Sequence, residues 1–136
     1  MKAFLVLLAV GASTAAFAGP AVASSNIGIT IRHQTVGCHA WAVGNGAYMA
    51  THALTIKAGT TLTFTDNDVM SHTLVQLSGP KVTILGARLA KMGAHTAFRL
   101  TKPGTYVFGT KAGEDYSKGV VTKGPDNVLR LIVTVK

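Results

Sequence analysis

The sequence predicts an all-β domain, an antiparallel β-sandwich or barrel of seven or eight short strands. Apolar residues alternate with small or polar ones in short runs, which is the pattern of strands with one buried face. Glycine, proline and asparagine separate these runs at a spacing typical of sandwiches. A stable helix is not expected, because the one stretch with helical character, around 89–93, is short and interrupted by glycine.

The N-terminal 23 residues have the features of a secretory signal peptide. Lys2 precedes an uncharged apolar run, Phe4–Val10, and small residues create two cleavage sites, after Ala18 and after Ala23. The run is too short to span a bilayer. We expect cleavage after Ala23, with Ala18 left open, and an exported domain at 24–136 that is periplasmic or extracellular and has no stable membrane insertion.

The mature chain would be small and basic. About 113 residues would remain, enough for one domain with its own core. The formal net charge would fall from +8 to +7, with twelve Lys and Arg against five Asp and Glu. The basic residues are spread singly, without alternating aromatics, so we expect no nucleic-acid binding. The charge suits an anionic partner, such as an acidic redox protein.

The expected strands follow in order from the alternation. The first is Ile27–His33 and the second is Cys38–Val43, which would place Trp41 in the core. The turn 34–37 joins them, and Gly44–His52 follows as a loop insertion.

The middle of the chain predicts two pairs of strands. Leu54–Ile56 and Leu62–Phe64 alternate on either side of the turn 58–60. Leu74–Leu77 and Val82–Leu85 flank a Ser-Gly-Pro turn in the same way.

The last strands flank a Pro-Gly turn. Phe98–Leu100 precedes that turn, and Tyr106–Phe108 resumes the alternation after it. The final strand is expected at Val128–Lys136 with four apolar residues on one face: Leu129, Leu131, Val133 and Val135.

Three segments resemble the cupredoxin family. Residues 54–75, LTIKAGTTLTFTDNDVMSHTLV, are similar to its two strands around an Ala-Gly turn, followed by a short loop and a histidine. Residues 98–116, FRLTKPGTYVFGTKAGEDY, and 127–135, NVLRLIVTV, are similar to its Pro-Gly-x-Tyr-x-Phe strand, ligand loop and last strand. The resemblance runs from about Ile27 to Val135. It implies a Greek-key sandwich that binds copper for electron transfer.

The resemblance also implies where copper ligands should lie. His72 falls on the family's first histidine ligand. The later ligand loop supplies a cysteine, a histidine and usually a methionine in the family, but here those cysteine and histidine positions fall on Thr110 and Gly113. Residues 106–136 contain no Cys, His or Met, so a blue-copper site of the usual construction cannot form. The domain has either lost the metal or takes its ligands from elsewhere.

Cys38 and His39 are the expected replacements. Cys38 is the only cysteine, so it cannot form an internal disulfide. The resemblance places the first turn at the metal end, near His72. Strict alternation would point only one of the two residues inward, so we expect a bulge or irregular turn at Gly37–Cys38. His33 is the alternative ligand, because it alternates in step with Ile31 and should point inward as that residue does.

Glu114 is expected to supply a carboxylate ligand from the acidic loop, with Asp115 or Met70 as alternatives. Cys, two His and a carboxylate resemble the ligand set of the red copper proteins, the nitrosocyanins. Their ligand order differs, so only the chemistry carries over: an anionic oxygen stabilises the cupric state and can leave an open position.

The remaining pairs of soft ligands, Met49 with His52 and Met92 with His95, are not expected to form a second copper site. The sequence contains none of the common catalytic motifs, so an electron carrier or copper-binding protein is favoured over an enzyme. Two alternatives stay open: a copper-binding or delivery protein without redox cycling, and a metal-free binding domain that kept the sandwich.

Overall fold

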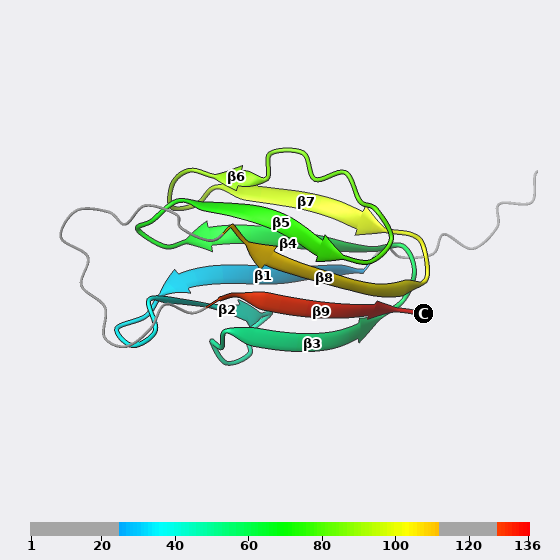
Figure 1. Cartoon of the computed structure of the whole chain (residues 1–136), viewed down its shortest axis with the longest axis horizontal. Coiled ribbons are helices and arrows are strands. Elements are labelled where there is room, and N and C mark those ends of the chain that lie inside the picture. Colours follow the sequence, from blue (N-terminus) through cyan, green and yellow to red (C-terminus); the bar gives the residue numbers. More distant parts are fainter. Residues whose placement is uncertain (1–24, 112–127) are drawn as a thin grey trace, which may run out of the picture.

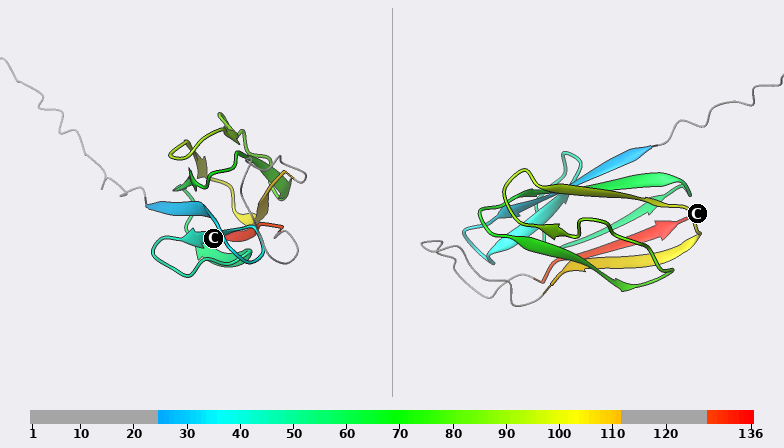
Figure 2. Two further views of the ribbon diagram at one scale, coloured as in Figure 1. Left: turned by 90° about the vertical axis from the view of Figure 1, so that its left-hand side faces the viewer. Right: turned by 90° about the horizontal axis from the view of Figure 1, so that it is seen from above.

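The computed structural model describes residues 25–111 and 128–136, which form two β-sheets packed face to face (Figures 1 and 2). The expected signal peptide and the acidic loop with Glu114 and Asp115 lie outside the described residues.

The first sheet has four strands in the order β2-β1-β4-β7. They are β2 (His39–Val43), β1 (Asn26–His33), β4 (Thr60–Asn67) and β7 (His95–Leu100). Strand β1 pairs antiparallel with β2 and parallel with β4, and β4 pairs antiparallel with β7.

The second sheet has five strands in the order β3-β9-β8-β5-β6. They are β3 (Thr51–Ile56), β9 (Arg130–Val135), β8 (Gly104–Thr110), β5 (His72–Ser78) and β6 (Arg88–Leu89). Strands β3 and β9 run parallel, and the other neighbours run antiparallel.

The predicted all-β sandwich is confirmed, although the described ranges contain nine strands and not the seven or eight expected. Those ranges contain no helix long and apolar enough to cross a membrane. The sheets are mixed and not antiparallel throughout: β1 pairs in parallel with β4, and β3 with β9. In each of these pairs the chain leaves the sheet after the first strand and returns to it before the second. The Greek-key order stays a prediction.

The strand expected at Val82–Leu85 is wrong. The segment between β5 and β6 has no strand, and only Arg88 and Leu89 pair with β5. The side chain of Gln76 explains the difference, because it donates a 2.8 Å hydrogen bond to the Pro80 carbonyl and accepts a 3.0 Å bond from the Val82 amide. Backbone groups that a strand ladder would use are thus satisfied locally.

The core lies between the sheets and contains most of the aromatic side chains of the described ranges. Trp41 is fully buried, as predicted, and its ring lies 6.1 Å from that of Phe64. Phe64 in turn stacks on Phe98 at 5.6 Å and meets Phe108 at 6.1 Å. These contacts join strands of both sheets, so the residue positions at the sandwich ends are fixed by a packed interior.

Candidate metal centre

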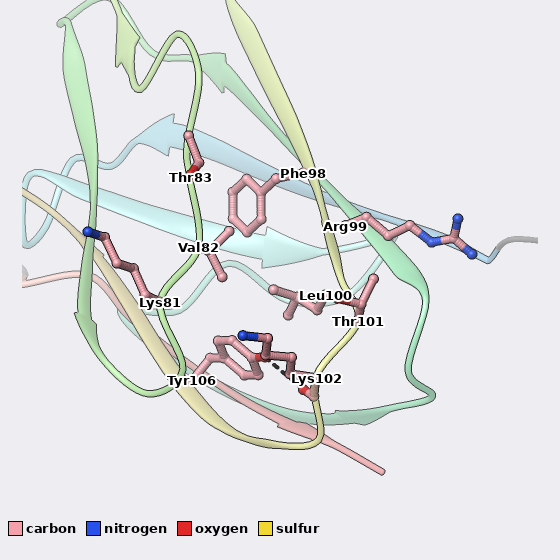
Figure 3. A pocket seen from close by; sticks show the side chains of 9 residues that line it. All are labelled: Lys81, Val82, Thr83, Phe98, Arg99, Leu100, Thr101, Lys102 and Tyr106. Carbon is pink, nitrogen blue, oxygen red and sulfur yellow. Dashed lines mark hydrogen bonds between the residues drawn. The ribbon is translucent and has the colours of Figure 1, made fainter.

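A surface pocket lies at one end of the sandwich, where β7 ends and β8 begins (Figure 3). Phe98, Leu100 and the ring of Tyr106 give it apolar walls, and Lys81 and Lys102 also line it. The Tyr106 hydroxyl donates a 2.7 Å hydrogen bond to the carbonyl of Lys102, which fixes the ring. Its lining contains no imidazole, thiol or carboxylate, so this pocket offers no strong metal ligand.

The opposite end of the sandwich gathers the polar side chains that the sequence singled out. Strand β1 ends at His33 and β2 begins at His39, and the hairpin register places these two histidines directly opposite each other. Asp68 follows the end of β4, and His72 begins β5. The β1–β2 turn and the β4–β5 loop both lie at the left-hand end in Figure 1.

An irregular turn occurs at Gly37–Cys38, where the sequence led us to expect one. Both residues have positive φ angles, 78° and 63°, and Cys38 is the only residue other than glycine with a positive φ in the described ranges. The His39 amide donates a 2.8 Å hydrogen bond to the Gly37 carbonyl, which closes a γ-turn around Cys38. Strict alternation therefore does not extend through Cys38, whose side chain is fully buried beside β2.

Two side-chain hydrogen bonds shape the loop that carries Asp68. Asp66 Oδ1 accepts a 2.9 Å bond from the Asp68 amide, and Asp68 Oδ1 accepts a 3.1 Å bond from the Met70 amide. Such bonds from an aspartate to the backbone two residues on are typical of Asx-turns. They hold the Asp68 carboxylate inside the molecule, and the whole residue is 1% exposed.

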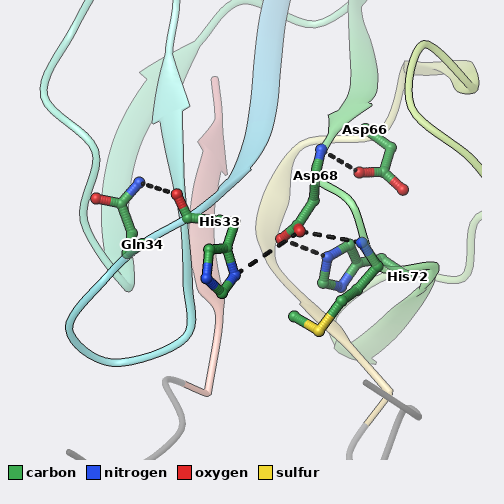
Figure 4. Close-up of polar contacts among 6 residues, drawn as sticks. His33, Gln34, Asp66, Asp68 and His72 are labelled. Atoms are coloured by element: carbon green, nitrogen blue, oxygen red, sulfur yellow. Dashed lines mark hydrogen bonds and ion pairs between the residues drawn. The ribbon is translucent and has the colours of Figure 1, made fainter. Parts of the chain in front are cut away.

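His72 is bonded to that carboxylate. Its Nε2 donates a 3.1 Å hydrogen bond to Asp68 Oδ2, and both side chains are buried (Figure 4). Burial by itself raises the pKa of Asp68. The hydrogen bonds from His72 and from the Met70 amide, with the charges of His72 and His33, outweigh burial and lower this pKa below its ordinary value of 3.8. Asp68 is therefore an anion at neutral pH.

The donor atoms of His39, Asp68 and His72 all lie within 4.8 Å of one another. The two imidazole rings meet edge to face, with centroids 4.8 Å apart and an interplanar angle of 61°. Two imidazoles and one carboxylate form a donor set that suits a divalent transition metal such as copper, zinc or iron. The described residues contain no other group of three such donors.

The structure thus brings two of the expected ligands, His39 and His72, into one cluster. Cys38 adjoins His39 in the chain but is not among the three residues of this cluster. Glu114 lies outside the described residues, and the carboxylate of the cluster is that of Asp68. Sequence reasoning missed Asp68, although it lies four residues before His72 and one of its neighbours, Asp66, is also acidic.

The two remaining pairs of Met and His lie elsewhere: one pair contacts Trp41 and the other is exposed. His52 Nε2 donates a 2.8 Å hydrogen bond to the carbonyl of Trp41, and Met49 forms a β-bridge with Trp41. His95 and Met92 are exposed.

Comparisons with known proteins give structural likeness only. No protein-family model matches the chain, and no curated protein matches it. Among solved structures, a purple cupredoxin from Nitrosopumilus maritimus is 20% identical with a TM-score of 0.48, covering 80% of this chain and 98% of its own. Amicyanin from Paracoccus versutus is 18% identical with a TM-score of 0.46, covering 88% and 87%.

Proposed function

We propose that this chain is an exported copper-binding protein that works in electron transfer or at an open copper site. One observation carries the proposal: the donor atoms of His39, Asp68 and His72 lie within 4.8 Å of one another. Divalent copper accepts imidazole and carboxylate ligands. The resemblance of the sequence motifs to the cupredoxins supports copper over other metals. Copper bound there would supply a one-electron redox centre.

Hydrogen bonds and sheet pairing orient the proposed ligands. Asp68 uses one carboxylate oxygen for the Met70 amide and the other for His72. Both histidines begin strands, so the sheets fix their backbones. Ligands whose orientation is set by hydrogen bonds and packing lose less freedom when they bind a metal.

Cys38 is the proposed thiolate ligand in the electron-transfer form of this site. The positive φ at Cys38 and its complete burial beside His39 support this role. The ligand set would then be one Cys, two His and a carboxylate, with Asp68 in the role expected of Glu114. The thiolate would be the covalent, electron-conducting ligand, and His39 and His72 would fix the geometry.

A second candidate function is copper binding or delivery without redox cycling. The observation that favours it is the absence of sulfur from the three donors of the described cluster. Nitrogen and oxygen ligands are sufficient to hold a divalent ion.

Optical and electron paramagnetic resonance spectra of the copper-loaded protein test both candidates. Thiolate ligation predicts an intense visible band in the wild-type protein that is lost in Cys38→Ser. A cupric spectrum without that band would favour delivery over electron transfer. His95→Gln, which removes an exposed imidazole, is the matched control and should leave the spectrum unchanged. A wild-type protein that takes up no copper would exclude both candidates and leave a metal-free binding domain.

Export and the acidic redox partner belong to the same proposal. The mass of the protein recovered from outside the cytoplasm tests export, because cleavage after Ala23 or Ala18 gives two different masses. The positive charge of the mature chain supports an acidic partner, and salt should weaken that association.

A further inference from the structure

We propose that His33 and Asp68 form an outer cation site through which copper enters and leaves the cluster of His39, Asp68 and His72. This inference rests on the proposed function, because it requires the inner cluster to bind copper.

Two of the three donors of the inner cluster, Asp68 and His72, are closed to solvent. The side chains of Asp68 and His72 are at most 1% exposed, and that of His39 is only half-buried. A hydrated ion must therefore lose water and meet a first protein ligand before it reaches His72. A metal site requires such an entry path.

His33 lies where that first ligand is needed. Its side chain is 24% exposed, so part of the ring meets solvent. Its Nδ1 atom, in contrast, is buried and has no hydrogen-bond partner among the described residues. A buried polar atom without a partner calls for an explanation, and a transiently bound ion provides one.

The distance from His33 Nδ1 to Asp68 Oδ1 fits an ion between the two atoms. The separation is 4.0 Å, which is too long for a hydrogen bond. Metal bonds to nitrogen and oxygen are each about 2.0–2.2 Å long, so one ion can span the gap at a wide angle. A simple ion pair would gain more from closer contact, and Asp68 Oδ1 already accepts the Met70 amide.

Asp68 connects the outer site to the inner one. Figure 4 shows its carboxylate between His33 on one side and His72 on the other. Oδ1 faces His33, whereas Oδ2 accepts the hydrogen bond from His72. His39 lies opposite His33 in the hairpin register. An ion held by His33 and Asp68 can therefore exchange one ligand at a time, keeping the carboxylate throughout.

Copper-loading kinetics test this role. The probe is Cu²⁺ supplied as its glycine complex, and uptake is followed by the emission of Trp41, the only tryptophan, which lies two residues from His39. Release is started by adding EDTA. In His33→Gln we expect loading and release to be slower by the same factor, roughly tenfold, which is the lower end of the effects that partners of metal ligands have on affinity or activity. The equilibrium affinity and the cupric resonance spectrum should stay unchanged.

Two further variants test whether slower loading is specific to the loss of His33. His95→Gln removes an exposed histidine of β7 and should load at the wild-type rate. His33→Thr, with a residue that favours strands, repeats the test if glutamine lowers the thermal midpoint.

The outcomes separate this inference from the proposed function. A wild-type protein that binds no copper would refute the proposed function itself. Copper binding at wild-type rates in both His33 variants would refute the entry role alone. A His33 variant with a changed resonance spectrum and a matching loss of affinity would make His33 a permanent ligand, which also overturns the entry role.

Discussion

The amide of His39 donates a 2.8 Å hydrogen bond to the carbonyl of Gly37, so Cys38 lies at the centre of a three-residue turn. The φ of 63° at Cys38 is one that residues with a Cβ rarely adopt. A γ-turn with positive φ at its centre is the rarer and more strained form. Backbone strain of this kind is often found at functional sites, and here it precedes a candidate metal ligand directly.

This strain predicts an unusual response to glycine at Cys38. The left-handed conformation costs a residue with a Cβ about 1–2 kcal/mol, and glycine avoids that cost. We therefore compare Cys38→Ala with Cys38→Gly by urea unfolding of the metal-free protein. The control is Ala40→Gly, at another buried position just inside β2.

At residue 40, replacing alanine by glycine should lower the free energy of unfolding, because glycine gains more freedom in the unfolded chain and buries less surface. At residue 38 the difference between the alanine and glycine variants should be about 1–2 kcal/mol smaller, or reversed. Equal differences at the two positions would show that the turn is not strained.

Alternation of apolar residues predicted most strands but not their partners. The four apolar residues of the last strand, from Leu129 to Val135, are all buried, as their spacing predicted. The pattern carries no information on strand direction, so the parallel pairs β1–β4 and β3–β9 were not predictable. Val82–Leu85 had the composition of a strand, but hydrogen bonds from the Gln76 side chain hold its start in another conformation.

The sequence predicted those candidate ligands that residue type and motif position identify. A lone cysteine beside a histidine, and a histidine at the family's ligand position, led to Cys38, His39 and His72. Asp68 could not be assigned in this way, because its inward orientation depends on the bond that it accepts from the Met70 amide. That bond exists only once the β4–β5 loop has folded.

Asp68 predicts a specific dependence of stability on pH. Its pKa in the folded protein is lowered below the ordinary value of 3.8, so the folded state favours the anion. The resulting stability is fully present above pH 3.8 and is lost as the pH falls through the lower, folded pKa. Asp68→Asn removes this contribution.

Urea unfolding of the metal-free proteins between pH 6 and pH 3 measures the effect. At pH 6 we expect Asp68→Asn to be less stable by about 3 kcal/mol, the cost of breaking a buried pair. The difference should begin to shrink below pH 3.8, because the unfolded chain takes up a proton at Asp68 before the folded protein does. Added salt should change it little, because the pair with His72 is buried. A difference that stays constant across this range would contradict the lowered pKa.

A single methyl group added at Gly79 should lower the stability of the fold strongly. Its φ is 103°, and a Cβ built there would clash with the Thr105 carbonyl oxygen and lie 2.8 Å from the Tyr106 Cα. Gly79→Ala should lower the free energy of unfolding by roughly 3 kcal/mol, from overpacking and from the disfavoured φ together.

Gly86→Ala is the matched control for Gly79→Ala. Gly86 also has a positive φ, 66°, but a Cβ there would meet nothing within 4 Å. Only the backbone cost of about 1 kcal/mol should remain. Thermal unfolding of both variants measures the difference, and equal losses would mean that the close approach of Gly79 to β8 does not constrain the fold.

Copper should stabilise the folded protein through the inner cluster. A ligand that binds only the folded state adds about 4.1 kcal/mol at a thousand times its dissociation constant, so the thermal midpoint should rise on copper loading. His72→Gln and Asp68→Asn should reduce this rise, because each removes one of the three donors. Differential scanning calorimetry with and without copper measures the rise in each protein.

His52→Gln tests whether copper binds at the cluster or at His52, a half-buried histidine outside it. His52 donates a hydrogen bond to the Trp41 carbonyl, so its loss should lower the midpoint of the metal-free protein. His52 contributes no donor to the cluster of His39, Asp68 and His72, so the rise caused by copper should keep its wild-type size. If His52→Gln abolished the rise and His72→Gln preserved it, copper would bind near Met49 and His52, and the inner cluster would not be its site.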